Sequence, residues 1–185
     1  MCSCKEFAII KIKQWLEKII IELNFCPFAK KEMINQRIHY HVSDHTHIDQ
    51  VLFQLGLQCD YLQKHSKIET TLIILDSGFQ GFEQYLDLLA AAEKWLSDHG
   101  YDGIFQLASF HPDYYFDGQP FDDAANYTNR SPLPMLHLLR EASIERVLSV
   151  YKQPEKIPEH NITLARAMGN EFFEDILKNI HNRRC

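Results

Sequence analysis

Residues 70–75, TTLIIL, are apolar or β-branched at every position and show no alternation of polar and apolar side chains. A strand of this kind has to be covered on both faces, as a central strand of an α/β sheet is. GFEQYLDLLAAAEKWLSDHG at 81–100 has helical spacing and ends at Gly100, and GIFQLASF at 103–110 predicts another strand. Strand, helix and strand in this order usually form a right-handed parallel crossover.

Other segments continue the alternation of strands and helices. Residues 38–42 alternate Ile, Tyr and Val with histidine, which predicts a half-buried strand near an edge of the sheet. Amphipathic helices are expected over 5–23, about 46–65, about 134–151 and about 160–181.

These elements predict an α/β fold with a small three-stranded, mostly parallel sheet, a β-α-β-α-β core and flanking N- and C-terminal helices. The alternative is an α+β fold with a mixed, ferredoxin-like sheet. A chain of 185 residues with 45% hydrophobic residues can bury one full core, and it contains no repeat or Gly/Ser linker. We therefore expect a single domain over residues 1–185.

Charge and cysteine usage exclude some classes of function. The net charge of −6 argues against nucleic acid as a partner, because binding to phosphate backbones needs a basic face. No run of about 18 apolar residues predicts a membrane span, and the N-terminus lacks the pattern of a signal peptide. Five unevenly spaced cysteines favour reduced thiols, so we expect a cytoplasmic protein. Cofactors and oligomeric state are not indicated.

The connection over 111–133 is the exception among otherwise short connections. It is rich in Tyr, Phe and Pro, which favours an ordered loop that carries a site over a disordered one. His111 opens this loop at the carboxyl end of a predicted strand, where ligands of parallel α/β sheets bind. We expect His111 to act in proton transfer or ligand binding, although a histidine before a proline is also an ordinary turn residue.

Arg140 lies on the apolar face of the helix predicted over 134–151, with His137 toward the edge of that face. A guanidinium keeps its charge, so in this position it needs a carboxylate, carbonyl groups or a bound anion. Asp122 or Asp123 could supply the carboxylate of a structural network. A bound anion would instead make this face the floor of an active site.

The residues just before this predicted helix suit an anion. Asn129, Arg130 and Ser131 precede Pro132 and Pro134, and free backbone N–H groups at a helix start together with arginines bind carboxylates or phosphates. The alternative is an ordinary helix start with Ser131 as its N-cap and Arg130 in solvent.

Cys26 follows the first predicted helix and precedes a proline, with lysines one turn further on. A thiol at such a position could have a lowered pKa and act as a nucleophile. Packing is the favoured interpretation, because Phe25 and Phe28 flank it and free cysteine is usually buried.

Two other patterns are weak signals of a metal site. One is the Cys2/Cys4 pair, and the other is His39 with His41, although such histidines more often mark a solvated strand face.

Four segments carry a resemblance to a known family: NFCPFA, ETTLIIL, QLASFHPDYYF and above all NYTNRSPLPMLHLLRE. They resemble the motifs of the bacterial family of unknown function DUF1415, from the first helix to about residue 169. The resemblance implies a short cytoplasmic bacterial domain without an established activity. The part of the chain that matches the family pattern contains most of the site residues considered above, namely Cys26, His111, Asp123, Asn126, Asn129, Arg130, Ser131, His137 and Arg140.

Three hypotheses for function follow. The favoured one is a small hydrolase or transferase for an anionic small molecule, with its site between the 111–133 loop and the 134–151 helix. In it His111, His137, Cys26 and Asp123 are catalytic, and the substrate is bound by Asn126, Asn129, Arg130, Ser131 and Arg140. The second is a metal-dependent enzyme with the ligands His111, Asp113, Asp123 and His137. The third is a non-catalytic binding or regulatory module in which the Arg140 network is structural.

Overall fold

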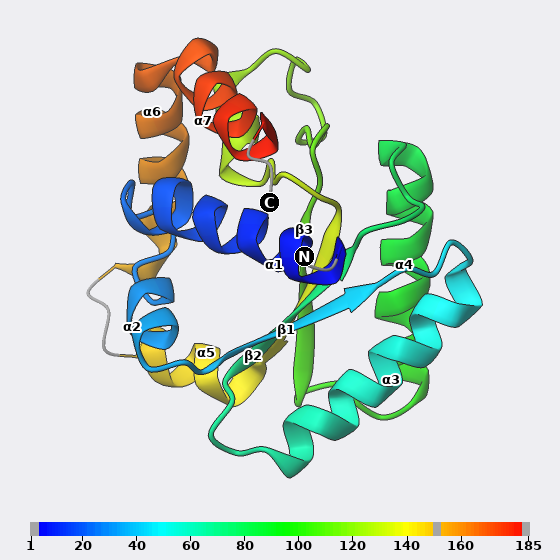
Figure 1. Cartoon of the computed structure of the whole chain (residues 1–185). Helices are drawn as coiled ribbons and strands as arrows, with labels where there is room; N and C mark the ends of the chain where they lie inside the picture. The colour runs from blue at the N-terminus through cyan, green and yellow to red at the C-terminus, as the bar shows by residue number, and fades with distance from the viewer. Residues whose placement is uncertain (1–3, 150–152, 183–185) are drawn as a thin grey trace.

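A mixed sheet runs through the centre of the molecule (Figure 1). The computed structural model describes residues 4–149 and 153–182, and in this part of the chain the sheet has four strands in the order β1-β2-β4-β3. The strands are β1 (Ile38–Ser43), β2 (Thr70–Leu75), β3 (Phe105–Phe110) and β4 (Met135–Arg140). The strands predicted at 38–42, 70–75 and 103–110 are therefore confirmed, and β2 is buried at all six positions.

The fourth strand, β4, was not predicted. β1 and β2 pair in parallel, whereas β4 lies between β2 and β3 and pairs antiparallel with both. The expectation of a three-stranded, mostly parallel sheet is wrong, and the mixed sheet of the alternative is confirmed. The helix expected over 134–151 is also wrong in its first part, and only α5 (Glu141–Leu148) is helical there. Residues 150–151 lie outside the described residues.

The sequence MLHLLR suits a strand as well as a helix, because a short apolar run does not distinguish the two by its spacing. The tertiary structure distinguishes them. Without β4, the backbone N–H and C=O groups along one edge of β2 and one edge of β3 would be buried without partners, which is costly. Pairing with β4 gives hydrogen-bond partners to both edges. These hydrogen bonds favour a strand at 135–140 over the helix that the spacing of the segment also allows.

Two long helices cover one face of the sheet. They are α3 (Ile48–Lys64) and α4 (Phe82–Asp98), so the helices expected over 46–65 and 81–100 are confirmed. Their apolar faces pack on the side chains that β2 and β4 direct to this face, including Ile73, Leu136 and Leu138. This forms one of two core clusters, on the side of α3 and α4 in Figure 1.

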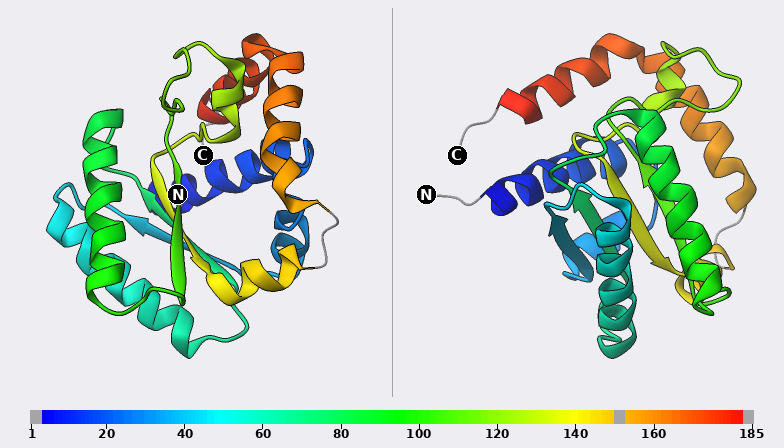
Figure 2. Two further views of the ribbon diagram at one scale, coloured as in Figure 1. Left: turned by 180° about the vertical axis from the view of Figure 1, so that it is seen from behind. Right: turned by 90° about the vertical axis from the view of Figure 1, so that its right-hand side faces the viewer.

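The opposite face is covered by helices from both ends of the chain (Figure 2). At the N-terminal end these are α1 (Cys4–Trp15), a π-helix η1 (Leu16–Ile21) that continues it, and α2 (Ala29–Ile34). At the C-terminal end they are α6 (Ile157–Met168) and α7 (Asn170–Asn182), which follow the short 3-10 helix η3 (Pro154–Lys156). The single helix expected over 160–181 is interrupted at Gly169, whose φ of 78° is not helical.

The long loop packs against these C-terminal helices. It contains a 3-10 helix, η2 (Ala124–Thr128), whose Tyr127 ring stacks on Phe173 of α7 at 4.8 Å between ring centroids. Trp15 Nε1 in α1 also donates a hydrogen bond to the carbonyl of Arg130 at 2.9 Å. The loop is thus ordered by contacts with both ends of the chain. No helix among the described residues is long and apolar enough to cross a bilayer.

Candidate binding site

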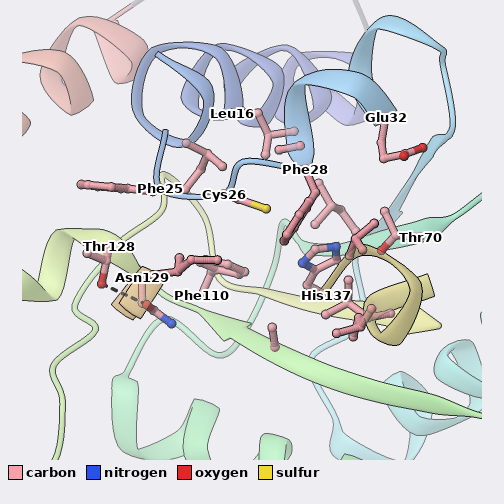
Figure 3. A pocket seen from close by; sticks show the side chains of 18 of the residues that line it. Leu16, Phe25, Cys26, Phe28, Glu32, Thr70, Phe110, Thr128, Asn129 and His137 are labelled. Atoms are coloured by element: carbon pink, nitrogen blue, oxygen red, sulfur yellow. Dashed lines mark hydrogen bonds between the residues drawn. The ribbon is translucent and has the colours of Figure 1, made fainter. Parts of the chain in front are cut away.

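A cavity of about 590 Å³ lies between the sheet and the helices of the N- and C-terminal segments. Its floor is the face of β2, β4 and β3 opposite to α3 and α4, and its walls come from η1, α2, α5 and α6. Most lining side chains are apolar, for example Leu16, Phe28, Leu72, Phe110 and Ile162. The π-helix lies along one wall, and such irregular helical turns often occur at functional sites. Figure 3 shows this cavity from close by.

His137 lies on the floor of the cavity. It is central in β4, between Leu72 of β2 and Ala108 of β3, and its ring points into the cavity (Figure 3). Its Nε2 is buried and has no hydrogen-bond partner in the protein. Burial lowers the pKa of His137 from 6.5 to about 4, because the charged imidazolium would lose its hydration. The imidazole is therefore neutral at physiological pH.

Cys26 faces the same cavity from the opposite side. It follows the π-helix, where its backbone N–H donates to the carbonyl of Ile20 at 3.3 Å, and its sulfur points into the cavity (Figure 3). Burial raises the pKa of the Cys26 thiol, and the backbone N–H groups of Phe28 and Ala29 offset this only in part. The thiol is therefore protonated in the free protein, unlike the thiolate of an activated nucleophile.

An ion-pair network borders the cavity next to α5. The buried carboxylate of Glu69 accepts hydrogen bonds from Arg37, from Ser143 and, at 3.2 Å, from Arg146. Glu32 of α2 joins the network through Arg37 Nη1 at 3.4 Å. These five residues join α2, the segments just before β1 and β2, and α5 at one end of the cavity.

His111 lies outside the cavity and is fully buried. Its Nε2 donates to the carbonyl of Phe79 at 3.0 Å, and its Nδ1 accepts a hydrogen bond from the backbone N–H of Asp113 at 3.0 Å. Tyr85 and Phe82 pack against its ring, with centroids 5.1 and 5.2 Å away. Nδ1 therefore holds the turn at the start of the long loop, and Nε2 joins that turn to the segment before α4. Burial lowers the pKa of the imidazole.

Asn126 and Arg130 hold the long loop together from inside. Asn126 accepts from the backbone N–H of Phe116 and donates to the carbonyls of Pro120 and Phe121, at 3.0–3.1 Å. The Arg130 guanidinium lies 4.6 Å from the ring centroid of Phe121 and 4.8 Å from that of Tyr127. It also donates to two loop carbonyls, at 2.6 and 2.9 Å. These contacts engage the polar groups that the sequence suggested for anion binding.

The remaining loop residues also have partners within the protein. Ser131 donates to the carbonyl of Leu133 at 2.7 Å, and Asn129 donates to the carbonyl of Ser109 at 3.0 Å. Asp123 caps η2 by accepting from the N–H of Ala125 at 2.9 Å. Its carboxylate also forms an ion pair with Arg166 of α6 at 2.6 Å, and the hydrogen bonds from Arg166 lower the pKa of Asp123.

Arg140 is the last residue of β4, not a residue on the face of a helix. Its Nε donates to the carbonyl of Ile68 at 3.1 Å, and its Nη2 donates to the carbonyls of Leu62 and, at 3.3 Å, His65. These carbonyls lie at and beyond the C-terminal end of α3, where the helix has unsatisfied acceptors and a cation is favourable. Of the three kinds of partner considered, the structure places carbonyl groups around Arg140.

Comparison with known proteins adds a family. The model of a family described as a protein of unknown function, DUF1415, matches residues 8–175. The chain belongs to this family. Searches of curated proteins and of solved structures returned no match. The resemblance seen in the four motif segments is thereby confirmed, and it extends over nearly the whole DUF1415 chain.

The cavity of this DUF1415 protein brings together only some of the residues expected to form a site. Cys26, Asn129, His137 and Arg140 line it, although the Arg140 guanidinium is engaged with the end of α3. His111, Asp123, Asn126, Arg130 and Ser131 are not among its lining residues. Within residues 4–149 and 153–182, no three His, Cys, Asp or Glu side chains form a group that could hold a metal ion, and Cys2 lies outside this part.

Several cavity residues could not be identified from the sequence. Asn161 in α6 lines the cavity, donates from Nδ2 to the carbonyl of Phe25 at 2.7 Å and leaves its buried Oδ1 without a partner. In the sequence it is one polar residue in an amphipathic segment. Its place in the site comes only from the tertiary contact with Phe25, 136 residues earlier in the chain.

Proposed function

We propose that this DUF1415 protein binds a small, mostly apolar organic molecule in the cavity between the sheet and the N- and C-terminal helices. The single observation that supports this most is the imidazole of His137, directed from the floor of a largely apolar cavity of about 590 Å³ with its Nε2 unpaired. Ligand sites in proteins are typically apolar cavities of 300–1,000 Å³ with a few polar groups that orient the ligand.

Burying an unpaired imidazole nitrogen is unfavourable by about 1–3 kcal/mol, so it needs a compensating role. A ligand that hydrogen bonds Nε2 would recover this free energy on binding. The arginines expected to bind an anion are already engaged with backbone carbonyls. This favours an uncharged ligand over the anionic one that the sequence suggested.

The experiment is a titration with prodan, a neutral dye whose fluorescence increases and shifts in apolar sites. We expect saturable binding to the wild-type protein. Ala108→Leu extends a larger side chain from β3 next to His137, so it should weaken prodan binding about tenfold or more. Ala90→Leu, the same change on the exposed side of α4, is the matched control. Equal affinity for both variants and the wild type would contradict the proposal.

A hydrolase or transferase is the second candidate function, because the thiol of Cys26 and the imidazole of His137 line the same cavity (Figure 3). In such a reaction Cys26 would attack an ester carbonyl, its proton would pass through His137 to the leaving alkoxide, and water would hydrolyse the thioester. Binding ranks ahead of this because the free thiol is protonated. Release of 2-naphthol from 2-naphthyl acetate, lost in Cys26→Ser, would support catalysis.

A further inference from the structure

The polar groups of the cavity are unequally satisfied: the hydroxyl groups of the lining residues donate within the protein, whereas Asn161 and His137 each have a buried atom without a partner. Thr70 Oγ1 donates to the carbonyl of Leu138 at 2.6 Å, and Thr128 Oγ1 donates to that of Ala125 at 2.9 Å. Ser143 donates to Glu69. These lining hydroxyl groups are therefore engaged with the protein and have no hydrogen left for a ligand.

Asn161 provides the clearest free acceptor. Its Nδ2 donates to the carbonyl of Phe25 at 2.7 Å, and only the amide nitrogen can donate to a carbonyl. The other terminal atom is thereby fixed as Oδ1, which is an acceptor only. That atom is buried and unpaired. A ligand group next to it must carry an N–H or O–H to satisfy it.

His137 adds a second acceptor. A neutral imidazole has one nitrogen with a hydrogen and one with a free lone pair. The pKa of about 4 keeps His137 in this neutral form, and its buried Nε2 is unpaired. Nε2 is an acceptor in the tautomer that carries its hydrogen on Nδ1, and a ligand N–H or O–H next to Nε2 selects that tautomer. Glu32 Oε2 also lacks a hydrogen bond, but it lies 3.4 Å from Arg37 Nη1 and belongs to the ion-pair network at the edge.

Positive charge that could hold an anion is not available on the cavity wall. Of the described lining residues, Arg140 and Arg146 carry a permanent positive charge. Arg140 donates to the carbonyls at the end of α3, and Arg146 donates to both carboxylate oxygens of Glu69. An anion that entered would lose its hydration without gaining a charged partner, which is strongly unfavourable.

We propose that the cavity selects uncharged, mostly apolar molecules that carry an N–H or O–H donor, and that Asn161 Oδ1 or His137 Nε2 accepts the hydrogen bond from that donor. The inference rests on the proposed function and names its ligand class. It also excludes carboxylates and phosphates of the same size.

The test is competition against prodan by three naphthalenes of similar shape: 2-naphthol with a donor, 2-methylnaphthalene without one, and the anion 2-naphthoate. We expect 2-naphthol to compete at roughly fivefold lower concentration than 2-methylnaphthalene, and 2-naphthoate to be the weakest. Hydrophobicity alone gives the opposite order for the first two, because a methyl group is more apolar than a hydroxyl group.

Two variants identify the acceptor. The one of Asn161→Leu and His137→Phe that removes the acceptor of the hydroxyl should lose the preference for 2-naphthol while the cavity still binds prodan. Gln58→Leu is the matched control, because Gln58 Oε1 is also buried and unpaired but lies in α3, outside the cavity. Asn161→Ala or His137→Leu replaces a variant that does not fold, so that both acceptors are tested.

The outcomes separate the two proposals. If the three naphthalenes compete in order of hydrophobicity, or if 2-naphthoate competes best, the donor selectivity is wrong and the binding function stands. If prodan itself does not bind saturably, the binding function fails and the selectivity fails with it. If both variants keep the preference for 2-naphthol, acceptors other than Asn161 and His137 provide it, and the assignment is wrong.

Discussion

Arg140 Nη2 at the end of β4 donates a hydrogen bond to the backbone carbonyl of Leu62 in the last turn of α3, 78 residues earlier in the chain. Together with the hydrogen bonds to Ile68 and His65, this contact holds the C-terminal end of α3 against the end of β4. It also gives the half-buried positive charge of Arg140 its partners without a carboxylate or a bound anion.

We predict that Arg140→Ala lowers the free energy of unfolding by about 2 kcal/mol, because several carbonyls lose a charged donor. Arg140→Lys should lose less, because it keeps a cation near the helix C-terminus but not the planar fork. Urea unfolding of both variants measures this. An Arg140→Ala protein as stable as the wild type would contradict the structural role, and equal prodan affinity is expected in all three proteins.

The unpaired imidazole of His137 makes stability depend on pH. The unfolded imidazole takes up a proton near pH 6.5, whereas the folded one does so only near pH 4. Between these values the unfolded state binds more protons, so stability falls as pH falls, by roughly 3 kcal/mol in total. Above pH 6.5 the contribution does not change with pH.

His137→Leu isolates this effect, because the other histidines are unchanged. We expect the variant to be at least as stable as the wild type at neutral pH, since it removes an unpaired buried nitrogen. Its advantage should grow between pH 6.5 and pH 4, as measured by unfolding at several pH values. A constant difference across that range would show that His137 titrates normally in the folded protein.

Burial makes the thiol of Cys26 a slow nucleophile. Since burial raises its pKa, we expect iodoacetamide at neutral pH to alkylate Cys26 at least about tenfold more slowly than the exposed Cys4 of the same molecule. Peptide mass spectrometry follows both sites, with Cys4 as the internal reference. Saturating prodan should slow Cys26 further and leave Cys4 unchanged. Equal rates at the two thiols would favour the nucleophile interpretation.

Asn126 is expected to be structural. Asn126→Ala removes three hydrogen bonds inside the 111–133 loop, so we predict a loss of about 3 kcal/mol in the free energy of unfolding. Chymotrypsin should also cut the variant faster near Phe116. The control is Asn35→Ala at an exposed position after α2, with an expected change below about 0.5 kcal/mol. Unchanged stability of Asn126→Ala would free this residue for a role in binding.

Local sequence patterns were sufficient for most elements. The apolar run at 70–75 predicted a strand covered on both faces, and β2 is buried throughout. The helices α3 and α4 follow from their amphipathic spacing. These predictions succeed because side-chain periodicity is a local property that each element carries by itself. The helix predicted from local spacing at 135–140 was wrong. The spacing of this segment fits a helix and a strand equally, and pairing with the edges of β2 and β3 makes it a strand.

The candidate site, like the fold, depends partly on local sequence and partly on tertiary structure. The sequence by itself determined the strands and helices with clear periodicity, membership of DUF1415 and the interest of Cys26, His137 and Arg140. Only the tertiary structure decided which of these share a cavity, because a cavity wall is assembled from segments far apart in the chain. In the folded protein Cys26, His137 and Asn161 line one cavity. Arg140 instead binds the end of α3, and His111 and Arg130 form hydrogen bonds that hold the long loop. The physical reason is that a polar side chain acquires its role from the partners left to it after the backbone has folded, and local sequence does not specify those partners.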